Sequence, residues 1–340
     1  MKHIRHTGID QPQPASIRLA VSVVVPTYHR DDLLERCLLA LISQDYPSSA
    51  YEILVVDDGR SDETEAFVGR FSERYGGPHI CYLRPPAGKR GPASARNTGW
   101  DVALGKIIAF TDDDTIPTRN WLEQGMSAMS AGAAAVWGHV EVPLPAHPSD
   151  AERNTAGLHG AEFITANCFV QREVLAAVGG FDERFLRAWR EDSDLYFTLL
   201  ERDYEVKPAP RAVVVHPAKD APAAACLKQH GNLYYDALLY KKHPRLYREK
   251  IATAPPLRYY AAVTAFIAAV IAGLFGSIAI AVVCLLVWLM LTGFVVVRRL
   301  RGIRASRPVV AGILWTSLFI PFLAVYWRLA GSLHYRAVFA

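Results

Sequence analysis

Apolar and polar positions between residues 19 and 222 follow two alternating rhythms. Uninterrupted apolar runs rich in β-branched residues, such as "LAVSVVVPTY" and "EILVVDDG", are typical of strands buried on both faces of a sheet. Between them, "DDLLERCLLALISQ" repeats leucine at three- and four-residue spacing, which predicts an amphipathic helix. Strand-like and helix-like segments continue to alternate up to "KIIAFTDDD". This order predicts an α/β fold with a mixed, mostly parallel sheet and helices on both faces.

The hydropathy pattern then changes. Residues 259–297 and 308–327 contain no Asp, Glu, Lys or Arg, and a helix needs roughly 20 apolar residues to cross a bilayer. The first stretch is too long for one crossing, and Gly273, Gly276 and Ser277 near its middle suit a tight hairpin. The pattern predicts about three transmembrane helices, at about 259–275, 277–297 and 308–328.

These patterns divide the chain into four parts. We expect a flexible tail over residues 1–18, the α/β domain over 19–222, interfacial or linker helices over 223–258 and an all-α membrane region over 259–331. In the third part, "LKQHGNLYYDALLYKKHPRLYREK" mixes aromatic residues and leucines with lysines. This segment can either lie in the membrane interface as an amphipathic helix or pack on the α/β domain.

Basic residues cluster beside the predicted membrane helices. The net charge of +4 does not indicate nucleic-acid binding, and the five cysteines lack the spacing of a metal site. The two clusters are Lys241, Lys242, Arg245, Arg248, Lys250 and Arg258 before the first span, and Arg298, Arg299, Arg301, Arg304 and Arg307 after the second. Three spans put both clusters on one side, which the positive-inside rule identifies as cytoplasmic. We expect a multi-pass protein of the cell (inner) membrane with its α/β domain facing the cytoplasm.

Two groups of aspartates follow predicted strands. Asp57 and Asp58 come after the second strand, and Asp112, Asp113 and Asp114 after the fourth. The carboxyl ends of parallel strands meet at one edge of the sheet, where such proteins bind ligands. On an extended segment residues i and i+2 point the same way, so Asp112 and Asp114 can converge on one cation. Carboxylates suit Mg²⁺ or Mn²⁺, and Mg²⁺ commonly also binds substrate phosphates.

Seven motifs occur in a fixed order between residues 21 and 217: "VSVVVPTYHR", "ILVVDDG", "GPASARNTGW", "IAFTDDDT", "GGFDERF", "WREDSDL" and "VVVHP". Together they resemble the family 2 glycosyltransferases, which have the GT-A fold of nucleotide-diphospho-sugar transferases. The resemblance implies a metal-dependent, inverting, hexosyltransferase-type transfer from a nucleotide-sugar donor. Arg60 replaces the serine usual in the second motif. The QxxRW motif of processive members is absent, which argues against synthesis of long polymers.

The same resemblance assigns residues to the donor and the metal. A base and a ribose would contact the end of the first strand, the base would be bound by Asp57 or Asp58, and Arg96 would lie near the diphosphate. Arginine offers planar donors to phosphate, although a surface salt bridge is an equal interpretation of Arg96. The implied donor-binding residues are Pro26, Thr27, Tyr28, Asp57, Asp58, Arg96, Asn97, Asp112 and Asp113. The implied metal ligands are Asp112, Asp114 and His216.

Later motifs are implied in acceptor binding and catalysis. Asn167 would face the donor sugar or the acceptor, and Trp189 and Arg190 would form the acceptor wall, although Trp189 could equally belong to the core. An attacking hydroxyl must lose its proton, so a carboxylate base is expected. In "WREDSDL" the family pattern favours Asp192 as this base over Glu191.

These observations predict a membrane-bound glycosyltransferase of cell-envelope glycan synthesis. UDP- or dTDP-type sugar donors are cytosolic, and a domain tied to the bilayer is expected to meet an acceptor in the bilayer. A hydroxyl or phosphate of a polyprenyl-linked saccharide, a polyprenyl phosphate or a glycolipid would serve. Two alternatives are a membrane-associated nucleotidyltransferase, whose glycine-rich loop is not found after the first strand, and a non-catalytic transferase-like scaffold.

Overall fold

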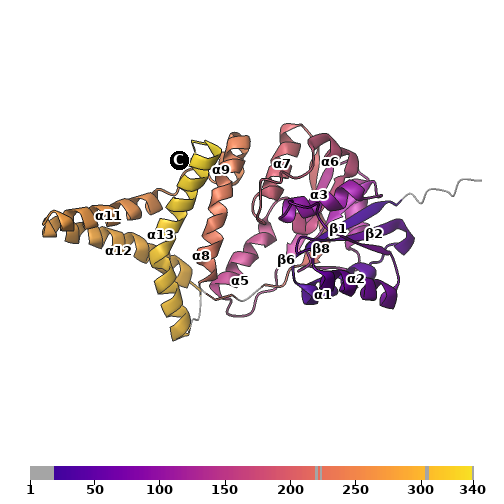
Figure 1. Cartoon of the computed structure of the whole chain (residues 1–340), viewed down its shortest axis with the longest axis horizontal. Coiled ribbons are helices and arrows are strands. Elements are labelled where there is room, and N and C mark those ends of the chain that lie inside the picture. Colours follow the sequence, from indigo (N-terminus) through magenta and orange to yellow (C-terminus); the bar gives the residue numbers. More distant parts are fainter. Residues whose placement is uncertain (1–18, 219–220, 223, 303–305, 339–340) are drawn as a thin grey trace, which may run out of the picture.

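The computed structural model describes residues 19–218, 221–222, 224–302 and 306–338. An α/β domain lies at one end of the molecule and a pair of long helices projects from the other (Figure 1). The predicted tail, residues 1–18, lies outside the described residues.

One eight-stranded sheet forms the centre of the α/β domain. Its strands are β1 Val21–Thr27, β2 Tyr51–Asp57, β3 His79–Leu83, β4 Ile107–Phe110, β5 Ile116–Pro117, β6 Ala135–Glu141, β7 Cys168–Gln171 and β8 Val206–Val215. The strand order is β3-β2-β1-β4-β7-β6-β8-β5. The first four strands in this order are parallel, β7 is antiparallel to both neighbours, β6 and β8 are parallel, and β5 is antiparallel to β8. The predicted mixed, mostly parallel sheet is therefore confirmed.

Helices cover both faces of this sheet. The helices that precede the apolar helices are α1 Asp31–Ile42, α2 Asp62–Tyr75, α3 Pro92–Val102, α4 Trp121–Met129, α5 Asp150–Thr155, α6 Arg172–Val178, α7 Glu191–Glu201, α8 Ala225–Gln229, α9 Leu233–Lys242 and α10 Pro244–Lys250, with 3-10 turns η1 Ser48–Ala50, η2 Ala156–Gly160, η3 Thr165–Asn167 and η4 His230–Asn232. One apolar core contains side chains from α1, α2 and α4, and the other contains side chains from α3, α6, α7 and α9. Because successive strand residues point to opposite faces, Val23 and Val24 belong to different cores.

The parallel strands end together and so define one edge of the sheet. Thr27 at the end of β1 is paired with Asp57 at the end of β2, and Val24 is paired with Phe110 at the end of β4. The aspartates that follow β2 and β4 are therefore brought to the same edge, as the alternation of strands and helices predicts.

The segment that could have been either interfacial or part of the domain packs on the domain. Ala237, Leu238 and Leu239 of α9 are buried in the same core as α7. Lys242, at the end of α9, forms ion pairs of 2.7 Å with Asp182 and 2.6 Å with Asp194. Burial of these groups fastens α9 to the start of α7.

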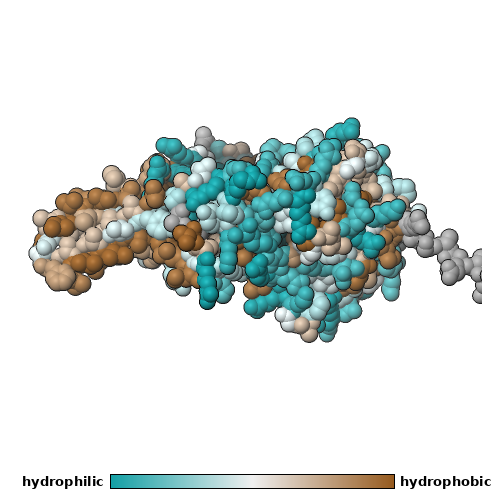
Figure 2. Space-filling model, turned by 90° about the horizontal axis from the view of Figure 1, so that it is seen from above, coloured by the Kyte–Doolittle hydropathy of each residue, from teal (hydrophilic) through white to brown (hydrophobic). Residues whose placement is uncertain are grey.

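Three helices in the described part of the chain are long and apolar enough to cross a membrane: α11 Leu257–Leu274, α12 Ile278–Leu300 and α13 Arg307–Tyr335. The first two form a hairpin that turns at Gly276, whose φ of 76° favours a residue without a side chain. Only 11% and 6% of their most apolar windows are buried. Apolar side chains cover this projecting hairpin, whereas hydrophilic side chains cover most of the α/β domain (Figure 2).

The helix α13 is placed differently from the hairpin. It runs across the base of the hairpin and alongside α8 and α9 (Figure 1), and 39% of its most apolar window is buried. In its first half, Thr316 Oγ1 accepts a hydrogen bond of 2.7 Å from Arg299 at the end of α12. In its last turn, the Tyr335 carbonyl accepts one of 2.7 Å from Lys241 of α9. The first half of α13 is thus bonded to α12, and its last turn is bonded to α9.

Candidate active site

A cavity of about 730 Å³ opens at the carboxyl edge of the sheet. Its wall combines the end of β4, residues 158–166, the start of α7 and the end of α10. The predicted site residues that line it are Arg96, Asp112, Trp189, Arg190, Glu191, Asp192 and His216. The fold thus gathers residues that lie far apart in the sequence around one space.

Arg96 connects two carboxylates in the cavity wall. Its Nη2 donates to Asp112 Oδ1 at 2.8 Å and its Nη1 donates to Glu191 Oε1 at 3.0 Å. The arginine side chain is only 3% exposed. Although burial opposes the charged form, the neighbouring carboxylates raise the pKa of Arg96 above its usual value. Arg96 is therefore a fixed, buried cation at the cavity, not part of a surface salt bridge.

Asp113 points into the protein, away from the cavity. Its side chain is fully buried, and its Oδ2 accepts a hydrogen bond of 2.7 Å from Thr27 Oγ1. Arg30 pairs with Asp113 at 2.7 Å and with Asp114 at 2.9 Å. Burial raises the pKa of Asp113 to about 6. Thr27 and Asp113, both predicted to bind the donor, here hold the acidic loop against the end of β1.

Asp114 and His216 form the pair best suited to a metal ion. His216 Nε2 lies 3.4 Å from Asp114 Oδ1, and two ligands of one octahedral Mg²⁺ at right angles lie ~3 Å apart. His216 Nδ1 lies 3.3 Å from the Pro217 carbonyl; a proton on Nδ1 would leave the Nε2 lone pair free for a metal. Among the described residues no three His, Cys, Asp or Glu side chains are gathered tightly enough to hold a metal. This donor set fits a cation that completes its shell with water and phosphate oxygens.

Asp192 presents a carboxylate oxygen to the cavity. Its Oδ1 accepts a hydrogen bond of 2.6 Å from the Ser193 backbone N–H, and its Oδ2 has no partner among the described residues. Glu191 Oε2 is buried and likewise has no hydrogen bond. Burial raises the pKa of both Glu191 and Asp192. A carboxylate with a raised pKa and one free oxygen is suited to accept a proton.

The acidic pair after β2 stabilises the turn that follows it. Asp57 is fully buried and accepts hydrogen bonds from two backbone N–H groups of this turn and from Tyr82 Oη, at 2.7 to 2.9 Å. Asp58 accepts one of 2.8 Å from the backbone N–H at the start of α3. Of the other predicted base-binding residues, Pro26 is half-buried at the end of β1 and Tyr28 is exposed. None of these four lines the cavity.

Trp189 and Arg190 form one wall of the cavity, and both side chains are hydrogen-bonded to α9. Trp189 Nε1 and Arg190 Nε both donate to Asp236 Oδ1 of α9, each at 2.8 Å. The guanidinium of Arg190 lies 4.5 Å from the centre of the Trp189 ring. Trp189 is half-buried, packs against an apolar core and lines the cavity. Its predicted contact with the acceptor stays a prediction.

Asn167 and Asn97 do not line the cavity, so their predicted roles stay predictions. Asn167 is fully buried. Its Nδ2 donates hydrogen bonds of 2.9 Å to two backbone carbonyls, one in β6 and one at the bulge in β8. Its Oδ1 accepts a hydrogen bond of 2.8 Å from Trp121 Nε1. Asn97 bonds through both ends of its amide to the backbone of Phe181, each at 2.9 Å. Both amides are therefore hydrogen-bonded within the protein.

Replacing Asn167 is therefore expected to destabilise the fold. Asn167→Ala leaves Trp121 Nε1 and two strand carbonyls unpaired in a buried place, at ~1–3 kcal/mol for each unsatisfied group. The midpoint of thermal unfolding should fall by about 5 °C or more. The exposed Asn120→Ala is the control; equal midpoints for the two variants would contradict this role.

The sequence did not single out three residues at this edge of the sheet. Arg30 bridges Asp113 and Asp114. It lies just after the first strand, so its position could have indicated that it reaches the same edge of the sheet as these aspartates. Lys250 and Glu162 line the cavity and pair at 2.6 Å. Lys250 was counted only as a membrane-flanking charge, because no local pattern indicates that α10 folds back to the cavity.

Comparisons with known proteins agree with this architecture. The family model "Glycosyl transferase family 2" matches residues 22–165. Glycosyltransferase AglE of Haloferax volcanii is 34% identical over 211 residues, which cover 58% of this chain and 67% of AglE. A GalNAc(5)-diNAcBac-PP-undecaprenol beta-1,3-glucosyltransferase of Campylobacter jejuni is 34% identical over 119 residues, covering 35% of this chain and 37% of that protein.

A solved structure extends the likeness to the fold of nearly the whole chain. The mannosyltransferase PcManGT of Pyrobaculum calidifontis, in complex with GDP-Man and Mn²⁺, matches with a TM-score of 0.54 and 20% identity. The match covers 95% of this chain and 88% of PcManGT. At this identity the likeness concerns the GT-A fold.

Proposed function

Because the chain belongs to glycosyl transferase family 2, we propose that it transfers the sugar of a nucleotide-sugar donor to an acceptor held in a membrane. One observation carries this proposal. The cavity that contains Arg96, Asp112 and Asp192 lies in a domain attached to three long apolar helices. The proposed donor is of the UDP or dTDP type.

We propose that Asp114 and His216, with Asp112 beside them, hold Mg²⁺ or Mn²⁺. The cation would neutralise the charge that develops on the leaving diphosphate. Arg96, fixed between Asp112 and Glu191, orients the Asp112 carboxylate and places a permanent positive charge at the same edge. The donor and Mn²⁺ bound by PcManGT support this assignment.

The acceptor proton is assigned to Asp192. Its Oδ1 is fixed by the Ser193 N–H, which leaves Oδ2 to take the proton as the acceptor oxygen attacks the anomeric carbon. Trp189 offers a flat apolar face beside it, which suits a sugar ring. Attack from the face opposite the diphosphate inverts the anomeric configuration.

The acceptor is proposed to be a lipid-linked saccharide, a polyprenyl phosphate or a glycolipid used in cell-envelope glycan synthesis. The relative from Campylobacter jejuni supports a lipid-linked acceptor, since its name describes an undecaprenol-linked substrate. The exposed apolar surface of the hairpin supports a location in the membrane (Figure 2).

We further propose that α11 and α12 cross the membrane while α13 lies along its surface. A spanning α13 of 29 residues would be ~43 Å long and would carry Tyr335 beyond the ~30 Å hydrocarbon core. Tyr335 instead contacts Lys241 of α9, and Asp236 of the same helix holds Trp189 at the cavity. Arginines lie at the start of α11 and at the end of α12, which together form the base of the hairpin. The α/β domain beside this base is therefore assigned to the cytoplasmic side of the cell membrane. The sequence predicts three crossings; these contacts favour two.

Asp114→Asn is expected to lose metal-dependent binding of nucleoside diphosphate and at least about a hundredfold in transfer rate, because one anionic ligand disappears. Calorimetric titration of nucleoside diphosphate with and without Mn²⁺ provides a readout independent of turnover. The exposed Asp101→Asn serves as a charge-matched control. Transfer by Asp114→Asn that is unchanged and insensitive to EDTA would sink the metal assignment.

A donor panel tests the proposed function itself. Purified full-length protein is incubated with each common nucleotide sugar and Mn²⁺, and the released nucleotide is identified. Release of nucleoside diphosphate from one donor is expected. Pyrophosphate-dependent formation of nucleoside triphosphate would instead identify a nucleotidyltransferase, and absence of turnover and of nucleotide binding for every donor would indicate a scaffold.

A further inference from the structure

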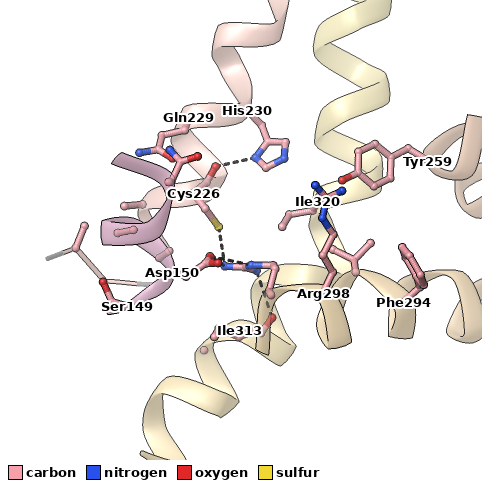
Figure 3. Close-up of a pocket in the computed structure, with 18 of the residues that line it drawn as sticks. Ser149, Asp150, Cys226, Gln229, His230, Tyr259, Phe294, Arg298, Ile313 and Ile320 are labelled. Atoms are coloured by element: carbon pink, nitrogen blue, oxygen red, sulfur yellow. Dashed lines mark hydrogen bonds and ion pairs between the residues drawn. The ribbon is translucent and has the colours of Figure 1, made fainter. Parts of the chain in front are cut away.

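A second, larger cavity lies where the α/β domain meets the apolar helices. It has a volume of about 1280 Å³, and its walls are α5, α8, the start of α11, the end of α12 and the first half of α13 (Figure 3). We call it the junction cavity. One side belongs to the soluble domain and the other to the helices proposed to enter or lie on the membrane.

Arg299 fixes the wall of the junction cavity. Its guanidinium pairs with Asp150 of α5 at 2.7 Å and donates to Thr316 and Ser317 of α13 at 2.7 and 3.0 Å. It also contacts Cys226 Sγ of α8 at 3.4 Å. The half-buried Arg299 therefore joins α12 to α5, α8 and α13.

The remaining charge in the junction cavity is positive. Three arginines line it, Arg258, Arg298 and Arg299, against one acid, Asp150, which is already paired with Arg299. Neither Arg258 nor Arg298 forms an ion pair with any residue that the structure describes. Figure 3 shows Arg298 and Tyr259 directed into the space that His230 faces from α8. The guanidinium of Arg258 lies over the Phe294 ring, 4.3 Å from its centre. Two guanidinium groups that no described carboxylate neutralises suit an anion, and phosphate matches their donor geometry.

The other half of the junction cavity is apolar. Leu291, Phe294 and Val295 of α12 and Ile313 and Ile320 of α13 line it. Leu291 and Arg298 lie ~10 Å apart along the helix axis, so the apolar wall continues about this far from the arginine towards the tip of the hairpin. A ligand that fits both halves has a phosphate-type head and a hydrocarbon chain.

The junction cavity lies close to the proposed reaction site. Ile251 lines the active-site cavity and Pro255 lines the junction cavity. Four residues can span at most ~14 Å. The segment from α5 to η2 similarly contributes Asp150 to one cavity and Leu158 to the other.

We propose that the junction cavity binds the phosphate or diphosphate group of a lipid-linked saccharide acceptor, in which a sugar hydroxyl and not the phosphate reacts, with the lipid chain running along α12 and α13. Arg258 and Arg298 bind the phosphate oxygens, and the apolar wall binds the first part of the chain. That this lipid is the acceptor rests on the proposed function. That the cavity binds a phosphate group with a hydrocarbon chain rests only on the residues that line it.

The test measures lipid binding by the full-length protein in detergent, without a sugar donor. The probe is a long-chain polyprenyl monophosphate, compared with the polyprenol of the same chain, with phosphatidylglycerol and with inorganic phosphate. The monophosphate should bind saturably and at least about tenfold more tightly than each of the others. Polyprenol lacks the phosphate, inorganic phosphate lacks the chain, and the phosphate of phosphatidylglycerol is a diester that offers fewer free oxygens to two guanidinium groups. Equal binding of phosphatidylglycerol or of inorganic phosphate would overturn the assignment to the acceptor.

A matched pair of double variants locates the site. Arg258→Gln with Arg298→Gln should weaken monophosphate binding about tenfold or more. Arg301→Gln with Arg307→Gln removes the same charge from the same membrane-proximal region, outside the cavity, and should bind as the wild type does. Arg258 and Arg298 are exposed, so equal unfolding midpoints are expected for all forms without lipid. Equal losses in both double variants, or no loss in the first, would overturn the proposal. Lipid binding without sugar transfer would contradict the proposed function and leave this site standing.

Discussion

Asp192→Asn is expected to bind donor and metal as the wild type does and to lose ~10²–10⁴-fold in the rate of sugar transfer. The amide keeps the shape of the side chain and can still accept the Ser193 N–H bond of 2.6 Å. It cannot take up the acceptor proton. Donor binding by calorimetry and transfer under single-turnover conditions separate the two effects.

Glu191→Gln is the matched control, because it makes the same chemical change one residue away. Its Oε1 accepts from Arg96 in either form, so a smaller loss is expected. Since burial raises the pKa of Asp192 and only the ionised form acts as a base, transfer should fall with decreasing pH at a higher pH than for an ordinary aspartate. Full transfer by Asp192→Asn together with none by Glu191→Gln would reverse the two assignments.

A reporter that fluoresces only in the cytosol is expected to be bright when fused to the C-terminus. With two crossings and α13 on the membrane surface, Tyr335 stays on the side of α9, to which it is hydrogen-bonded. A side chain at Gly331 would collide with the backbone of Tyr234 on α9, 2.4 Å away. This close packing leaves no room for lipid between the helices.

Two further fusions calibrate that measurement. A reporter at the N-terminus should be bright, and one inserted at the turn around Gly276 should be dark, because that turn is the end of the hairpin farthest from the α/β domain (Figure 1). A dark C-terminal reporter beside a bright N-terminal one would mean that α13 crosses the membrane.

The parts of the fold that depend on local pattern could be predicted from the sequence. The β-branched runs form buried strands such as β1 and β2 because their residues face apolar cores on both sides of the sheet. The aspartates after β2 and β4 reach one edge because parallel strands end together. The glycine-containing interruption at Gly276 is the turn of the hairpin because it tolerates a positive φ.

The parts that depend on long-range packing could not be predicted. Asn167 is buried because a bulge in β8 presents a carbonyl to its amide, and nothing near residue 167 signals that bulge. Arg30 meets Asp114 across 84 positions of sequence. Hydropathy finds α13 apolar enough to span a membrane, but it does not distinguish a side facing lipid from a side facing α9.

Transfer of labelled sugar into lipid tests the central claim most directly. Membranes that contain the wild-type protein or Asp192→Asn are incubated with labelled nucleotide sugars and Mn²⁺ and then extracted with organic solvent. The account predicts that label from one donor enters the lipid extract with the wild type and not with Asp192→Asn. Label that stays in the aqueous phase with every donor, or that enters lipid equally with both proteins, would contradict it.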